Sequence, residues 1–180
     1  MHQETIKRFN SLKEKRLSID ITRGKPDKDQ LDLSNGLIDI SIPAVSDDGA
    51  DLRNYGEPFG IIEARKLGSE LLNAPVENVL ACEQSSLLLT YQMVLANFLF
   101  AEPNPWKNIN NPKFICPVPG FDRHFMMLSD FGIDAIPVPL TAEGIDLEAF
   151  TDVLKEENVV GMLCVPRHSN PSGEIYSDEN

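Results

Sequence analysis

Short apolar runs alternate with helix-like segments toward the end of this 180-residue chain. We predict five elements in chain order: strand 113–118, helix 122–130, strand 134–138, helix 147–156 and strand 159–165. Strands that alternate with helices of about ten residues are typical of a parallel sheet with right-handed crossovers. The sequence therefore predicts the α/β class, with helices packed on a mostly parallel sheet.

The upstream half begins with a predicted amphipathic helix at 4–17, followed by an irregular stretch over 21–51 that glycine and proline punctuate. An irregular stretch of about thirty residues in a compact domain tends to be functional or to pack on something else. A helix is expected at 61–72 and a short strand at 78–82. Residues 86–100 are apolar on every side, which predicts a buried helix.

The formal charge of −12 argues against nucleic acid and anionic membranes as partners, because both attract basic surfaces. It leaves an anionic cofactor open, because a local group of backbone N–H donors can hold phosphate in an acidic protein. No apolar run approaches the roughly 18 residues of a membrane span, and the start lacks a signal-peptide core. Cys82, Cys116 and Cys164 are expected to be small buried hydrophobes of a reducing compartment. We expect a cytoplasmic protein without a metal site.

A turn of Asn170, Pro171, Ser172 and Gly173 follows the last predicted strand. In open α/β sheets, ligands bind outside the carboxyl ends of the strands. The Asn170 side chain would offer both a donor and an acceptor there. The alternative is an ordinary turn that ends a strand, since all four residues are common turn formers.

Four segments match, in the same order, the motifs of one known family: Tyr55-Gly56-Glu57-Pro58-Phe59-Gly60, Gln84-Ser85-Ser86-Leu87, Pro119-Gly120-Phe121-Asp122-Arg123-His124 and Asn170-Pro171-Ser172-Gly173. Together they resemble the class I/II aminotransferases, the pyridoxal-phosphate (PLP) enzymes of fold type I. The segment Thr22-Arg23-Gly24-Lys25-Pro26 is similar to the aspartate aminotransferase subgroup called type Ic. The resemblance extends from about Ile19 to the last residue.

This resemblance implies the N-terminal, incomplete part of the PLP-dependent transferase fold type I. Residues 1–50 would form a helix and an irregular arm of the small domain, and 51–180 the first part of the large PLP-binding domain. The cofactor would be pyridoxal 5'-phosphate. The partners would be an amino acid, aspartate, glutamate or alanine, and a 2-oxo acid. The full-length enzyme would be a homodimer.

The resemblance also assigns roles to single residues. Gln84, Ser85 and Ser86 would hold the cofactor phosphate at a helix start, although Ser85 or Ser86 could simply cap that helix. Phe121 would cover the pyridine ring, unless it is a core phenylalanine. Asn170 would contact the cofactor and the substrate.

Two further roles fall in the first third of the chain. Tyr55 would give its hydroxyl to the phosphate of the neighbouring subunit; the alternative is an ordinary surface tyrosine. Gly24 would lie near the substrate carboxylate. Arg23 could favour an anionic substrate, although a solvated arginine explains it equally well.

Aminotransferase chemistry needs a lysine that forms a Schiff base and moves a proton. None of the nine lysines matches the family's position, so no catalytic residue is expected in this chain. We therefore expect the first two-fifths of a longer enzyme, inactive by itself. Two alternatives stay open: an aminotransferase-like effector domain of a transcription regulator, and a PLP carbon–sulfur lyase.

Overall fold

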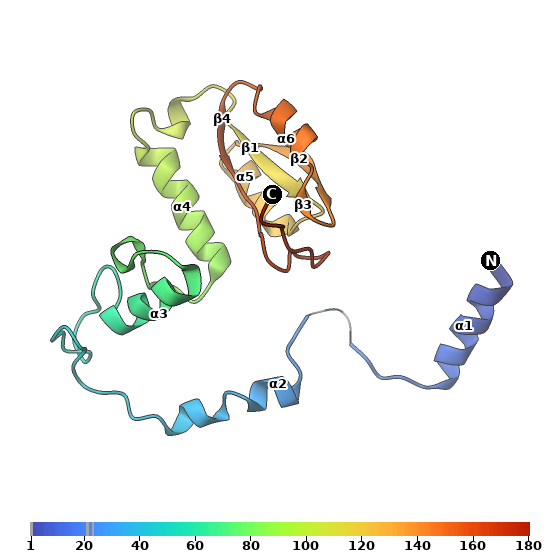
Figure 1. The fold of residues 1–180 in the computed structure, drawn as a ribbon, viewed down its shortest axis with the longest axis horizontal. Coiled ribbons are helices and arrows are strands. Elements are labelled where there is room, and N and C mark those ends of the chain that lie inside the picture. Colours follow the sequence, from blue (N-terminus) through green and yellow to red (C-terminus); the bar gives the residue numbers. More distant parts are fainter. Residues whose placement is uncertain (1, 21, 23) are drawn as a thin grey trace. The chain divides into compact units, whose positions relative to one another are not determined.

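The computed structural model describes residues 2–20, 22 and 24–180, which divide into two compact units, Met1–Gly56 and Glu57–Asn180 (Figure 1). The first unit contains the helices α1 (His2–Glu14) and α2 (Lys28–Asp32) and the 3₁₀ helix η1 (Asn35–Asp39). The second unit contains, in chain order, α3 (Ile62–Leu72), η2 (Val76–Asn78), α4 (Ser86–Phe100), η3 (Trp106–Asn108), β1 (Lys113–Val118), α5 (Asp122–Asp130), β2 (Asp134–Thr141), β3 (Gly144–Ile145), α6 (Leu147–Val153) and β4 (Val159–Met162). No helix of the described residues is long and apolar enough to cross a membrane.

In the first unit, the predicted irregular stretch over 21–51 is wrong in part, because it contains α2 and η1. Asp27 and Gln30 form a capping box: the Asp27 carboxylate accepts from the Gln30 N–H at 3.0 Å, and Gln30 Oε1 accepts from the Asp27 N–H at 2.9 Å. Such reciprocal bonds satisfy the first free N–H groups and start a helix. Ile21 and Arg23 lie outside the described residues.

The second unit is built on a four-stranded sheet with the order β3-β2-β1-β4. Strand β1 pairs in parallel with both β2 and β4, which confirms the predicted α/β class. Strand β3 is antiparallel to β2 and has only two residues, too few for the sequence pattern to reveal. Strand β4 ends at Met162 rather than Val165, because the chain leaves the sheet after the Leu163 N–H bonds to the Ile115 carbonyl at 3.0 Å.

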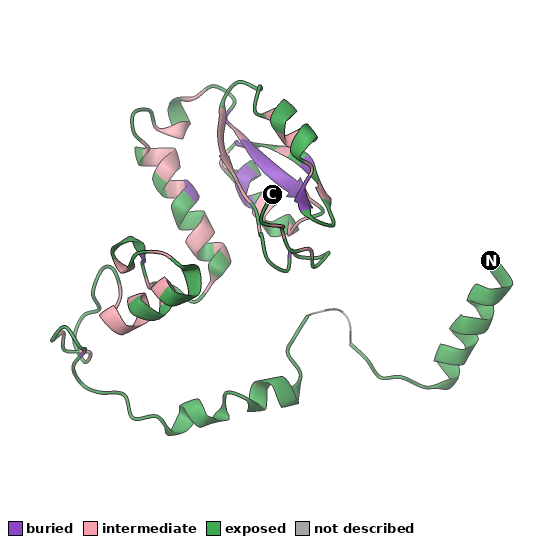
Figure 2. Ribbon diagram, in the orientation of Figure 1, coloured by how far each residue is buried: buried purple, intermediate pink, exposed green. Residues whose placement is uncertain are grey.

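The core lies on both faces of β1, whose four central residues are buried (Figure 2). On one face, Phe114 and Cys116 join Val94 of α4 and Leu128 of α5 in one cluster. On the other face, Ile115 packs with Val138 and with residues of α6. Side chains alternate between the faces of a strand, so β1 supplies both clusters and holds α5 against the sheet.

Helices α3, α4 and α5 begin and end within one residue of their predicted bounds, but two other expectations are wrong. The strand expected at 78–82 is absent, because a strand needs a hydrogen-bonded neighbour and no described strand pairs with it. Helix α4 is not buried all round: only Val94 is fully buried, and Met93 and Phe100 are 60% and 73% exposed. Its apolar surface exceeds what the rest of this unit covers.

The three cysteines are free. Cys116 is buried in β1, and burial raises the pKa of its thiol to about 11. Cys82 and Cys164 are exposed, contrary to the prediction. Cys82 is the last residue of the expected strand that does not form, and Cys164 comes just after β4 ends.

Candidate functional site

The carboxyl ends of β1 and β4 are neighbours, because the two strands are parallel and paired. Phe121 follows β1 and Asn170 lies in the segment after β4. Both residues line one small pocket, together with Pro117, Gly120, His124, Phe125, Leu163, Cys164, Val165 and Ser169. The topology thus brings together two of the predicted ligand-binding residues, at the end of the sheet where ligands of α/β proteins bind.

Phe121 occupies the N-cap position of α5, and its ring is half-buried. It meets His124 edge to face, with ring centroids 5.2 Å apart and an interplanar angle of 90°. Burial lowers the pKa of His124 below its ordinary value of 6.5, which favours the neutral imidazole. The preceding Gly120 has no room for a side chain, because a Cβ there would lie 2.7 Å from the Phe125 ring.

Asn170 is exposed and belongs to a short turn whose first residue, Ser169, is buried. The Ser169 N–H donates to the Glu174 carbonyl at 3.0 Å, which closes the turn. Gly173 has φ of +85°, a conformation that glycine adopts without steric cost. The turn that the sequence indicated is therefore present, with the Asn170 side chain at the edge of the pocket.

Ser85 is the N-cap of α4, and its hydroxyl accepts from the Leu88 N–H at 3.3 Å. The capping alternative is therefore correct for Ser85. Among the described residues, the N–H groups of Ser86 and Leu87 have no acceptor, as is usual for the first turn of a helix. Capping by Ser85 thus leaves donors at the helix start where an anion is favoured.

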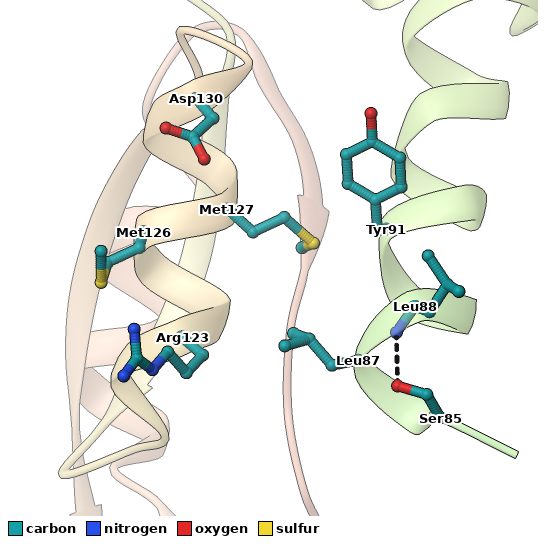
Figure 3. Close-up of a pocket in the computed structure, with 8 residues that line it drawn as sticks. All are labelled: Ser85, Leu87, Leu88, Tyr91, Arg123, Met126, Met127 and Asp130. Atoms are coloured by element: carbon teal, nitrogen blue, oxygen red, sulfur yellow. Dashed lines mark hydrogen bonds between the residues drawn. The ribbon is translucent and has the colours of Figure 1, made fainter.

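Ser85 also lines an open cleft of about 380 Å³ between α4 and α5. Figure 3 shows its lining residues: Ser85, Leu87, Leu88, Tyr91, Arg123, Met126, Met127 and Asp130. Arg123 places a cation in the same cleft as the start of α4, a role that no sequence motif indicated. Its place two residues after Phe121, in the first turn of α5, is the signal that could have identified it.

The first turn of α5 separates the two hollows. Arg123 lines the cleft that contains Ser85, and His124 lines the pocket that contains Phe121 and Asn170. Gln84 and Ser86 are exposed and line neither hollow. Ser85, Phe121 and Asn170, to which the resemblance assigns one cofactor, thus do not line one hollow: Ser85 lines one, Phe121 and Asn170 line the other, and α5 borders both.

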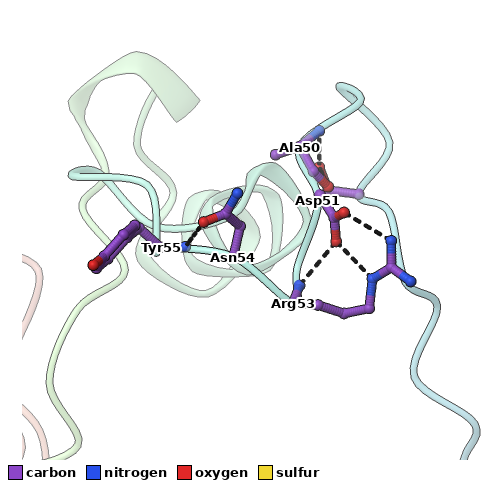
Figure 4. A network of polar contacts seen from close by, with 6 residues as sticks. Ala50, Asp51, Arg53, Asn54 and Tyr55 are labelled. Atoms are coloured by element: carbon purple, nitrogen blue, oxygen red, sulfur yellow. Dashed lines mark hydrogen bonds and ion pairs between the residues drawn. The ribbon is translucent and has the colours of Figure 1, made fainter.

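Gly24 and Tyr55 belong to the first unit. Gly24 is exposed, and a Cβ there would meet nothing within 4 Å. Tyr55 is 96% exposed and points away from a network of polar contacts at residues 50–54 (Figure 4). Arg23, discussed with these two residues, lies outside the described residues.

Comparison with known proteins gives the chain a family. The family model described as "Aspartate amino-transferase" matches residues 1–180. An aspartate aminotransferase of Corynebacterium glutamicum is 40% identical over 185 residues, which cover 99% of this chain and 42% of that protein. The chain thus spans less than half the length of this relative.

Solved structures of aminotransferases also share the fold of this chain. The crystal structure of an aspartate transaminase from Corynebacterium glutamicum has a TM-score of 0.84 and 38% identity, and the match covers 99% of this chain and 43% of that one. An α-aminoadipate aminotransferase of Thermus thermophilus shares the fold at 22% identity, with a TM-score of 0.54 over 69% of this chain and 29% of its own. By the match over its whole length, this chain belongs to the aspartate aminotransferase family.

Proposed function

We propose that this chain is the PLP-binding part of an aminotransferase that moves an amino group between an amino acid and a 2-oxo acid. The main support is the pocket at the carboxyl ends of β1 and β4, which is lined by Phe121 and Asn170. The family description supports aspartate as the amino donor, and glutamate or alanine is proposed from the resemblance alone. The Thermus thermophilus enzyme of the same fold binds N-(5'-phosphopyridoxyl)-L-leucine, which supports a pyridoxal phosphate cofactor.

The residues present fit such a cofactor at its phosphate end. The start of α4 offers the N–H groups of Ser86 and Leu87, and the Ser85 hydroxyl lies beside them. Arg123 lines the same cleft and would balance the charge of a phosphate dianion. Gln84 and Ser86 complete the proposed set, with exposed side chains free to reach a bound anion.

We propose the residues of the neighbouring pocket for the ring end, although the pocket itself holds only about 20 Å³ in this structure. Phe121 would cover one face of the pyridine, which keeps the ring flat and excludes water. The Asn170 amide would hydrogen-bond a polar group of the ring and also touch the substrate. When bound, pyridoxal phosphate supplies the aldehyde that carries the amino group and the electron-withdrawing ring.

The remaining roles are proposed from the resemblance. Gly24 would lie near the substrate carboxylate, and Tyr55 would donate its hydroxyl to the phosphate in the second subunit of a homodimer. We further propose that the chain works in the cytoplasm and does not transaminate alone, because no lysine matches the family's position. Treatment with cofactor and borohydride should then leave no single lysine labelled stoichiometrically; such a label would contradict this.

Cofactor binding can be tested by ³¹P NMR titration of pyridoxal phosphate with the chain. Ser85→Gly removes the hydroxyl but retains most of the capping ability, and Arg123→Ala removes the cation. Each should weaken binding about tenfold, because hydrogen bonds to a charged phosphate are stronger than neutral ones. Arg8→Ala on α1 removes an exposed arginine as a control and should change nothing. Unchanged affinity in both cleft variants would overturn the proposed phosphate position.

A further inference from the structure

Tyr55 combines near-complete exposure with a hydrogen-bonded main chain. Its side chain is 96% exposed, and its N–H donates to Asn54 Oδ1 at 2.8 Å. An exposed aromatic residue at the end of a hydrogen-bonded turn suits recognition, because a main chain held in place beforehand loses less entropy on binding. The residues just before Tyr55 make the contacts that hold this turn.

Asp51 and Arg53 form a compact fork immediately before Tyr55 (Figure 4). Arg53 Nε donates to Asp51 Oδ1 at 2.9 Å and Nη2 donates to Oδ2 at 2.8 Å. The Arg53 N–H donates to the same Oδ1 at 3.1 Å. One carboxylate therefore accepts three bonds from Arg53, two from its side chain and one from its main chain.

The fork stands on a small hairpin rather than on a free loop. Asp51 makes an isolated antiparallel bridge to Val45, and the Leu52 N–H donates to the Ala44 carbonyl at 2.9 Å. Within the hairpin, the Ser46 N–H donates to the Ala50 carbonyl at 2.9 Å, and Ser46 is only 6% exposed. The position of Asp51 is thus set by residues on its N-terminal side.

Two hydrogen bonds connect Asp51 of the fork to Tyr55. The Asn54 N–H donates to the Asp51 carbonyl at 3.1 Å, and Asn54 Oδ1 then accepts from the Tyr55 N–H. We propose that Asp51 and Arg53 are positioning residues that hold the main chain of the turn from which Tyr55 would reach the cofactor phosphate of the second subunit. The proposal rests on the proposed role of Tyr55. It requires arginine, because lysine cannot form the two parallel bonds.

The first measurement is the order of the turn, monitored by NMR hydrogen exchange at the Asn54 and Tyr55 amides of the whole chain. Arg53→Ala and Arg53→Lys should both speed exchange severalfold, with no rescue by lysine. Lys28→Ala breaks a different exposed ion pair in the same unit, with Asp32, and should leave both amides unchanged. Equal protection in all variants would overturn the proposal.

The second measurement separates positioning from a merely structural role. Tyr55→Phe should weaken pyridoxal phosphate binding about fivefold, and Arg53→Ala should do the same while Tyr55 is present. In the Tyr55→Phe background, Arg53→Ala should have no further effect, which is the signature of coupled residues. If Tyr55→Phe weakens binding but Arg53→Ala does not, the positioning role fails and the proposed function stands. If Tyr55→Phe has no effect, the proposed role of Tyr55 fails, whatever the exchange rates show.

Discussion

At the residue scale, His124 is the group whose protonation most directly reports the candidate site. Burial lowers its pKa below 6.5, so the folded state binds a proton less readily than the unfolded chain, and the Phe121 ring packs against the imidazole. The contribution of His124 to stability is therefore complete above about pH 6.5 and is lost as pH falls toward the folded pKa. We expect an NMR titration midpoint of His124 below 6.5 and stability that declines over this window.

Phe121→Ala tests the cause of that shift. Removal of the ring exposes the imidazole, so the pKa of His124 should rise toward its ordinary value. Phe9→Ala removes an exposed phenylalanine of α1 and should leave the titration unchanged. A midpoint that stays in place in Phe121→Ala would mean that other parts of the pocket desolvate His124.

At the element scale, the pairing of β1 with β4 depends on a close approach at Gly161. A Cβ at this position would lie 2.4 Å from the ring of Phe114, which is buried in the core. Gly161→Ala should therefore cost about 1–3 kcal/mol of unfolding free energy, the usual penalty for overpacking. Urea denaturation measures it, with Gly36→Ala as the control, since a Cβ at Gly36 would meet nothing within 4 Å. Phe114→Leu in the Gly161→Ala background should recover part of the loss.

The elements also differ in how well the sequence pattern predicted them. The bounds of β1 and α5 were predictable, because the buried apolar run Phe114–Cys116 and the following helical pattern each depend on local residues. The strand at 78–82 was not, because a strand exists only with a partner and the pattern carries no information about partners. Asn170 and Phe121 could be paired in advance through the rule for parallel strand ends. The cleft with Arg123 could not, because it depends on how α4 and α5 pack.

At the scale of the whole molecule, the second unit carries its own core. The two clusters around β1 consist of residues from Val94 to Ile145, with further packing from α6, β4 and Tyr176. None of the first unit's described residues belongs to either cluster. Periodicity and composition do not record how apolar residues divide between cores, so the expected boundary at residues 50–51 came from the resemblance alone.

This division predicts that Glu57–Asn180 folds without the first 56 residues. A chain that begins at Glu57 should keep slow hydrogen exchange at the amides of β1, because the bonds from β1 to β2 and β4 lie within that unit. It should also keep the depressed pKa of His124, since the Phe121 ring lies within the same unit. The Ser85 and Arg123 cleft should still bind pyridoxal phosphate, and only the contribution of Tyr55 should be lost. If β1 exchanged rapidly in the shortened chain, the first unit would be required for the core, contrary to the separate clusters seen here.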